Sequence, residues 1–187
     1  MCYFITGIFS GNVSVGDINT IGKDYGLKFG YCENDFVQNQ LKPGEHYISK
    51  MSKYCDCGTP LGMFKRHDNN QTGEAQKTEM AKLKQKGWSD AKIRRLLNDR
   101  NKRAEQEANK FEQGKLSASY EVQKWVDFIV RLFDSTSVKT FGILLHWYNG
   151  GVDTERIKLK GRAMIDKTKL STLTLLEMEE DTLLIII

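Results

Sequence analysis

The chain has strand-like segments at both ends and a long, charged, helical segment between them, and this order constrains the fold most. Its first apolar run, Cys2–Phe9, is rich in β-branched and aromatic residues, as buried strands are. Near the other end, Val138–Tyr148 is apolar on both alternating faces, which predicts a central strand. Strands, then helices, then strands favour an α+β fold over a doubly wound one. We therefore predict one domain, residues 1–187, with a mixed sheet built from N- and C-terminal strands.

Five shorter segments complete the predicted sheet. Two of them precede the helical part, and three follow the long apolar strand. The last two form a closing hairpin, joined by the acidic turn Glu179–Asp181. The segments are Leu27–Cys32, about His46–Met51, Ile157–Leu159 and Thr172–Met178, the last paired with Thr182–Ile187.

The inserted helical segment covers about residues 69–134. Its periodicity predicts helices at 73–86, at 90–112 and at 119–133, with Ser89 as the N-cap of the second. The third helix is apolar over more than half of its surface, so we expect it to cover the sheet. The first two carry the positive charge, since residues 74–115 hold 12 Lys/Arg against 7 Asp/Glu. We predict that residues 69–116 form a projecting basic helical hairpin.

No segment has the roughly 20 apolar residues that a membrane-spanning helix needs. The longest apolar runs are Phe141–Leu145 and Leu183–Ile187, and the N-terminal run is too short for a secretory signal. We therefore expect a cytoplasmic protein without a membrane partner. Because thiols stay reduced in the cytoplasm, the four cysteines of the chain are better explained as core residues, metal ligands or reactive thiols than as disulfides.

The most informative chemical feature is the Cys-Asp-Cys-Gly turn at residues 55–58. A tight turn can direct the thiols of Cys55 and Cys57 to the same side, and Gly58 allows backbone amides to approach the sulfurs. Two thiolates are half of the ligand set of a structural zinc ion. The alternative is that both cysteines are ordinary turn residues or reactive thiols.

The chain offers no second cysteine pair, so the remaining ligands of a zinc ion must come from distant residues. We predict a zinc site formed by Cys55, Cys57, Cys32 and His67. The full set of candidates for the two distant positions is Cys2, Cys32, His46 and His67.

Cys2 supports a second hypothesis, a cysteine-dependent hydrolase or transferase. If the initiator methionine is removed, the α-amine of Cys2 can act as general base for its own thiol. Alternatively His146, near the end of a predicted strand, or His46 can serve as the base for Cys2 or for one of the paired thiols. A buried strand cysteine and a half-buried structural histidine are the simpler explanations.

Residues 82–103 form the most basic stretch, with nine Lys/Arg against two Asp/Glu. A helix of this charge can follow phosphates or dock an acidic protein, although solvated helix faces also have such sequences. We define the basic surface as Lys84, Lys86, Lys92, Arg94, Arg95, Arg100, Lys102 and Arg103.

The common nucleotide-binding, zinc-protease and serine-hydrolase motifs do not occur in the chain. The favoured hypothesis is therefore a non-enzymatic binding or regulatory protein. Its partner, a protein or a nucleic acid, would bind the basic surface, and zinc would stabilise the Cys55–Cys57 turn. Whether the protein is an enzyme stays open from sequence alone.

Overall fold

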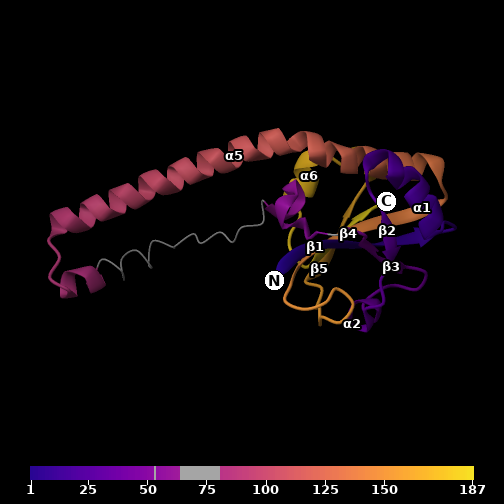
Figure 1. Ribbon diagram of the computed structural model, residues 1–187, viewed down its shortest axis with the longest axis horizontal. Coiled ribbons are helices and arrows are strands. Elements are labelled where there is room, and N and C mark those ends of the chain that lie inside the picture. Colours follow the sequence, from indigo (N-terminus) through magenta and orange to yellow (C-terminus); the bar gives the residue numbers. More distant parts are fainter. Residues whose placement is uncertain (53, 64–80) are drawn as a thin grey trace. The chain divides into compact units, whose positions relative to one another are not determined.

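The computed structural model describes residues 1–52, 54–63 and 81–187. Contacts divide the chain into two compact units, Met1–Lys65 with Ala118–Ile187, and Arg66–Ser117. The first unit holds a six-stranded mixed sheet in the order β2-β3-β1-β4-β6-β5 (Figure 1), which confirms the predicted α+β class. Its strands are β1 Cys2–Gly11, β2 Phe29–Tyr31, β3 His46–Lys50, β4 Val138–Tyr148, β5 Gly161–Ile165 and β6 Thr182–Ile186.

The two longest strands, β1 and β4, lie together at the centre of the sheet. They pair antiparallel from Cys2 opposite Tyr148 to Gly11 opposite Val138. All other neighbours are antiparallel as well, except β5 and β6, which run parallel. The central place of β4 explains why its sequence is apolar on both faces.

Helices connect and cover these strands. Most are short, and capping side chains define where several begin: Ser14 and Asp17 form a capping box at α1, and Asn34 caps α2. The α-helices whose two ends both lie in the described residues are α1 Val15–Gly22, α2 Asp35–Gln38, α3 Pro60–Met63, α5 Asp90–Ser135 and α6 Thr172–Leu176. The 3₁₀ turns are η1 Lys23–Tyr25, η2 Asp56–Gly58 and η3 Lys167–Lys169.

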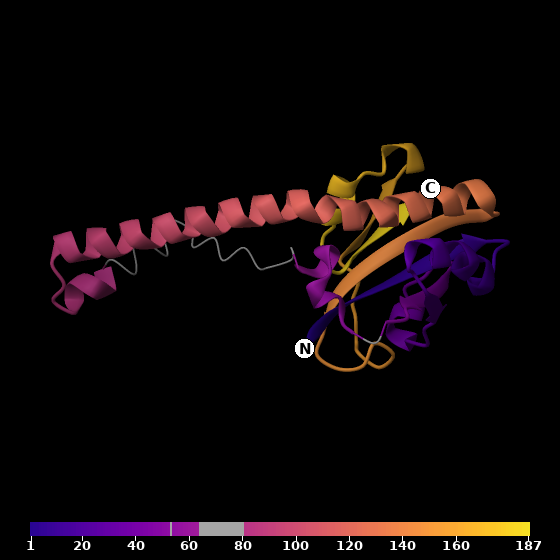
Figure 2. The ribbon, with the colours of Figure 1, turned by 45° about the horizontal axis from the view of Figure 1, so that its top comes forward.

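Residues 118–135 of α5 lie along one face of the sheet (Figure 2). The ring of Phe128 is fully buried, with its centroid 5.6 Å from those of Phe29 in β2 and Phe141 in β4. Trp125 meets Phe128 edge-on. The prediction that this helical segment covers the sheet is therefore confirmed.

The opposite face of the sheet carries a second apolar cluster. Ile8, Tyr47 and Leu144 pack there with Ile157 from the segment that follows β4. The buried Tyr47 hydroxyl donates to Thr6 Oγ1 at 2.9 Å, so the one polar atom of that ring is satisfied. Both faces of the sheet are thus buried, which fixes the position of its central strands.

Two predicted strands are wrong. Residues 157–159 are irregular: Ile157 is buried, and the Leu159 N–H donates to Gln40 Oε1 at 2.9 Å instead of to a neighbouring strand. The strand of this region comes slightly later, as β5. Residues 172–176 form α6 because Ser171 caps a helix there, accepting the Thr174 N–H at 3.2 Å. The predicted closing hairpin therefore does not exist, and β6 pairs with β4 and β5.

The second and third predicted helices are one helix, α5, which runs without a break from Asp90 to Ser135. Its predicted start is correct, since Ser89 Oγ accepts the Lys92 N–H at 3.4 Å. Of the first predicted helix, residues 81–85 are helical and the preceding part lies outside the described residues. The projecting hairpin of residues 69–116 stays a prediction.

Candidate metal centre

One edge of β1 is only partly covered by a neighbouring strand. Strand β3 pairs with β1 from Thr6 to Phe9, and the first residues of β1 extend beyond it. The turn at residues 55–57 lies against this free part: the Tyr3 N–H donates to Cys57 Sγ at 3.1 Å, and the Ile5 N–H donates to Asp56 Oδ2 at 2.8 Å. The Cys-Asp-Cys turn thus replaces a strand at this edge.

Asp56 is the residue that holds the turn in place. It is 1% exposed, and its second carboxylate oxygen forms an ion pair with Lys50 at the end of β3. A buried carboxylate without a cation and hydrogen-bond donors would cost several kcal/mol, so this pairing is required. Sequence reasoning missed Asp56 because an aspartate in a turn is usually solvated.

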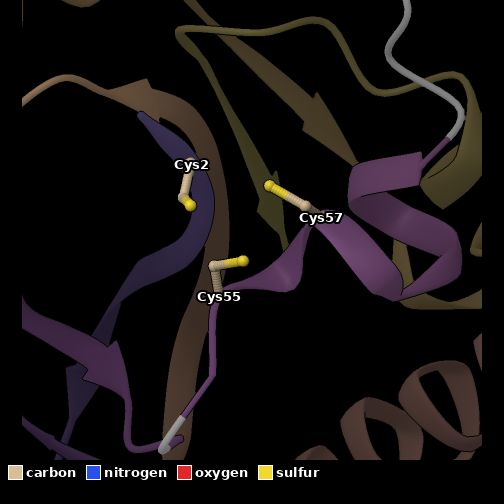
Figure 3. A group of neighbouring side chains, drawn as sticks. All are labelled: Cys2, Cys55 and Cys57. Carbon is tan, nitrogen blue, oxygen red and sulfur yellow. The ribbon is translucent and has the colours of Figure 1, made fainter.

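Cys2, Cys55 and Cys57 form a group that we call the thiol cluster. Their Sγ atoms all lie within 4.8 Å of one another, and Figure 3 shows the side chain from β1 facing the two from the turn. Tetrahedral zinc with Zn–S bonds of about 2.3 Å separates its sulfur ligands by about 3.8 Å. Small side-chain movements therefore suffice to place the three sulfurs on one ion.

The surroundings favour thiolate at one of the three sulfurs. The Cys57 backbone N–H, together with hydrogen bonds from the Cys2 and Cys57 side chains, lowers the pKa of Cys55. Hydrogen bonding to Cys55 and burial raise the pKa of Cys2 in turn. Of these two thiols, Cys55 is thus the one whose surroundings favour the thiolate, which is the form in which cysteine binds a metal ion.

Glycine acts in this turn at a position that the sequence did not indicate. Backbone N–H groups do approach the sulfurs, as that of Tyr3 does at Cys57, but a Cβ on Gly58 would meet nothing within 4 Å, so the missing side chain of Gly58 is not what allows this approach. A Cβ on Gly62, in α3, would lie 2.2 Å from the Asp56 carbonyl oxygen. Gly62 is therefore the residue that allows α3 to pack directly on the turn.

The structure does not bring Cys32 to this group. Cys32 follows β2, and its N–H donates to the Tyr47 carbonyl at 3.1 Å, near the start of β3, whereas the cysteine turn follows the end of β3. Burial raises the pKa of Cys32 to about 11. Cys2 therefore supplies the third sulfur of the thiol cluster. His67, the other predicted ligand, lies outside the described residues, and His46 stacks on Phe9 at 5.0 Å.

His146, the predicted base, belongs to a second group, which we call the imidazole cluster. Its members are His146, Glu155, Glu180 and Asp181. In His146, Nδ1 lies 2.5 Å from Asp181 Oδ1, and Nε2 lies 3.6 Å from Glu155 Oε1. Nε2 is buried and has no hydrogen-bond partner among the described residues. His146 therefore makes no hydrogen bond to Cys2, and the cysteine-dependent enzyme stays a prediction.

Backbone N–H groups fix the carboxylate of Glu155. Those of Asn149 and Gly150 both donate to Oε2 at 2.7 Å. Burial raises the pKa of Glu155, but these two N–H groups and His146 outweigh it, so the pKa lies below its usual value. Glu155 is thus an oriented, ionised carboxylate. No sequence pattern indicates this role, because Glu155 lies within the irregular segment between β4 and β5.

Within the second unit, the described cations of the basic surface are exposed. Lys84 forms an ion pair with Asp90 at 2.9 Å, and the Lys92 ammonium lies 4.0 Å from the ring centre of Trp88. Arg94, Arg95 and Lys102 are exposed. Arg100 and Arg103 lie in α5 outside the described side chains.

No protein-family model matches this chain, and neither a curated protein nor a solved structure matches it. Among the residues that the structure describes, no helix combines the length and the apolarity that crossing a membrane requires. Function must therefore be inferred from the residues themselves.

Proposed function

We propose that this protein is a zinc-stabilised binding protein, in which Cys2, Cys55 and Cys57 hold one structural zinc ion. The observation that carries the proposal is the convergence of three Sγ atoms within 4.8 Å from two segments more than fifty residues apart. Three thiols at this distance suit zinc, which prefers sulfur and nitrogen ligands in a tetrahedral arrangement.

The role of the ion is structural. The ion ties the first residues of β1 to the turn, beside the hydrogen bonds from Tyr3 to Cys57 and from Ile5 to Asp56. Because the ligands belong to distant segments, binding energy becomes folding energy. No fourth His, Cys, Asp or Glu of the described residues joins the group. The fourth position is left to water or to a ligand outside those residues, for which His67 remains the sequence prediction.

The test is the zinc content of protein purified without added metal. We expect about one zinc per chain, and a loss of most of it in Cys55→Ser and in Cys57→Ser. Cys32→Ala is the matched control, since Cys32 lies in the core away from the thiol cluster, and it keeps the zinc. Wild-type protein with less than about 0.2 equivalents overturns the proposal.

Titration of the metal-free protein with Co²⁺ identifies the ligands directly. Thiolate-bound cobalt gives a charge-transfer absorption that imidazole and carboxylate ligands do not give. We expect this band in wild type and in His146→Ala, but not in the Cys55→Ser/Cys57→Ser double variant. A band that survives in the double variant contradicts the ligand assignment.

For the binding activity, we propose that the basic surface contacts the phosphates of a nucleic acid. Support comes from the exposed cations of residues 82–102 and from the few acidic residues among them. Contacts of this kind release counterions, so the logarithm of the affinity falls linearly with the logarithm of the salt concentration, with a slope of about −0.7 to −0.9 per phosphate.

A salt titration with a labelled oligonucleotide tests this second part. Arg94→Glu/Arg95→Glu should weaken binding by at least about tenfold and reduce the salt slope. Lys124→Glu, on the same helix in the first unit and paired with Glu121 at 2.9 Å, is the control and should change little. Absent binding, or an affinity that is independent of salt, excludes nucleic acid and leaves an acidic protein as the partner class.

A further inference from the structure

The imidazole cluster contains an unsatisfied polar atom. His146 Nε2 is buried and has no hydrogen-bond partner among the described residues. The nearest carboxylate oxygen, Glu155 Oε1, is 3.6 Å away, which is too long for a hydrogen bond. Buried nitrogen atoms are rarely left in this state without a bound water or ion.

The distance between these two atoms matches that of two ligands on one metal ion. With metal–nitrogen and metal–oxygen bonds of about 2.1 Å, ligand atoms are separated by about 3.0 Å at a right angle and about 3.4 Å at a tetrahedral angle. The observed 3.6 Å needs only a slightly wider angle. The distance therefore suits two ligands of one ion better than it suits a hydrogen bond.

The other ring nitrogen is arranged as in metal-bound histidines. Nδ1 lies 2.5 Å from Oδ1 of Asp181, the residue just before β6. When Nδ1–H donates to a carboxylate, the tautomer is fixed and the Nε2 lone pair is directed at the ligand. The Asp181 carboxylate thus orients the imidazole, and the two N–H groups on Glu155 Oε2 orient the second ligand.

The local charge favours a cation. The carboxylates of Glu155, Glu180 and Asp181 surround one imidazole, while one ammonium group, that of Lys160, reaches Asp181 Oδ2 at 3.1 Å. The Lys160 side chain is 60% exposed, so solvent weakens its compensation. The negative charge around the imidazole is therefore only partly neutralised.

We propose that His146 Nε2 and Glu155 Oε1 bind a divalent cation of the class that accepts nitrogen and oxygen ligands, with Asp181 as the positioning residue. This site is separate from the thiol cluster and uses harder ligands. It does not depend on the proposed zinc site, and it can be occupied whether or not that site is.

Mn²⁺ is the probe, because it takes carboxylate and imidazole ligands and disfavours thiolates. Electron paramagnetic resonance measures free Mn²⁺ during a titration with purified full-length protein. We expect one bound Mn²⁺ per chain, with an affinity at least about tenfold lower in His146→Ala and in Glu155→Gln. His46→Ala and Cys57→Ser are the controls, and both should bind as wild type does.

Two further variants separate a metal site from a structural ion pair. Lys160→Ala removes the competing ammonium, so it should tighten Mn²⁺ binding, whereas an ion-pair network would only lose stability. Asp181→Asn keeps an acceptor for Nδ1–H and should bind more tightly than Asp181→Ala. Thermal unfolding of each variant shows that it is folded, and Glu155→Gln serves if His146→Ala does not fold.

Several results overturn the proposal. Wild-type protein that leaves the free Mn²⁺ signal unchanged excludes the site. Equal binding by wild type and by both His146→Ala and Glu155→Gln places the ion elsewhere. A loss in Glu180→Gln without a loss in Glu155→Gln moves the ion to the Nδ1 side of the ring. Loss of Co²⁺–thiolate absorption, by contrast, concerns the thiol cluster alone.

Discussion

The N–H of Ile5 and the carboxylate of Asp56 form a buried hydrogen bond of 2.8 Å between residues 51 positions apart. It links the central strand to the turn that carries two of the three clustered thiols. Because Asp56 is also paired with Lys50, the position of the thiol cluster depends on one buried charge.

Removal of the Asp56 carboxylate should therefore be costly. We expect Asp56→Ala to lower the free energy of unfolding by about 3–5 kcal/mol, since it leaves the Lys50 ammonium without its partner. Asp56→Asn should cost less, because its amide oxygen still accepts the Ile5 N–H. Urea unfolding measures both. Asp134→Asn, in the exposed ion pair with Lys167, is the control and should change stability by less than about 1 kcal/mol.

Substitution by alanine should have different effects on stability at the two glycines of the turn region, Gly58 and Gly62. Gly62→Ala places a Cβ 2.2 Å from the Asp56 carbonyl oxygen, so we expect a loss of about 1–3 kcal/mol and weaker metal retention. Gly58→Ala has open space and should be tolerated. Urea unfolding and zinc content test the pair. Equal behaviour of the two variants would show that α3 does not pack on the turn in solution.

The ion pair of Glu45 and Arg162 should make the free energy of unfolding depend on pH. Burial raises the pKa of Glu45, but the two hydrogen bonds of 2.8 Å from the Arg162 guanidinium, the Lys42 N–H and the positive charges of both residues together lower it more. The pKa of Glu45 therefore lies below its ordinary value. The contribution of this pair is therefore present above the unfolded-state pKa of about 4.3 and is lost as the pH falls through the folded-state pKa.

Glu45→Gln tests this dependence. At neutral pH we expect a loss of about 1.5–3 kcal/mol, the usual range for hydrogen bonds to a charged group. Below pH of about 4 the difference from wild type should shrink, because wild type loses the ion pair as well. A difference that stays constant across acid unfolding curves would contradict the assignment.

The aromatic contact between α5 and the sheet should dominate the stability of the first unit. Phe128→Ala removes a fully buried ring that meets Phe29 and Phe141, so we expect a loss of about 3–5 kcal/mol. Tyr120→Ala, on the same helix and 72% exposed, is the control and should cost less than about 1 kcal/mol. The midpoint of urea unfolding reports both changes.

Strand β4 illustrates what the sequence could predict. Its eleven residues are apolar on both faces, and the observed bounds, Val138–Tyr148, are the predicted ones. The segment 172–176 illustrates the opposite case, because its threonine residues favour a strand, its leucine residues favour a helix, and the Ser171 cap starts a helix. Local capping decided a segment whose composition was ambiguous.

The candidate site was predictable only in part, for a reason of register. That Cys55 and Cys57 share a turn follows from their spacing. Cys2 meets them because β3 ends at Lys50, which lets the turn reach the free start of β1. No local sequence pattern encodes this contact. The same holds for His146 and Asp181, which are 35 residues apart and meet through the pairing of β4 with the start of β6.

The placement of the thiol cluster also has a consequence for synthesis. Strand β1 ends at Gly11, and its long partner β4 begins only at Val138. At about 5–20 residues per second, a ribosome needs on the order of ten seconds to make the chain between them. During that time one edge of an apolar strand lacks its native neighbour and can pair with other chains. The cysteine turn is complete by residue 57, so its hydrogen bonds with the start of β1 can form on the nascent protein well before β4 emerges.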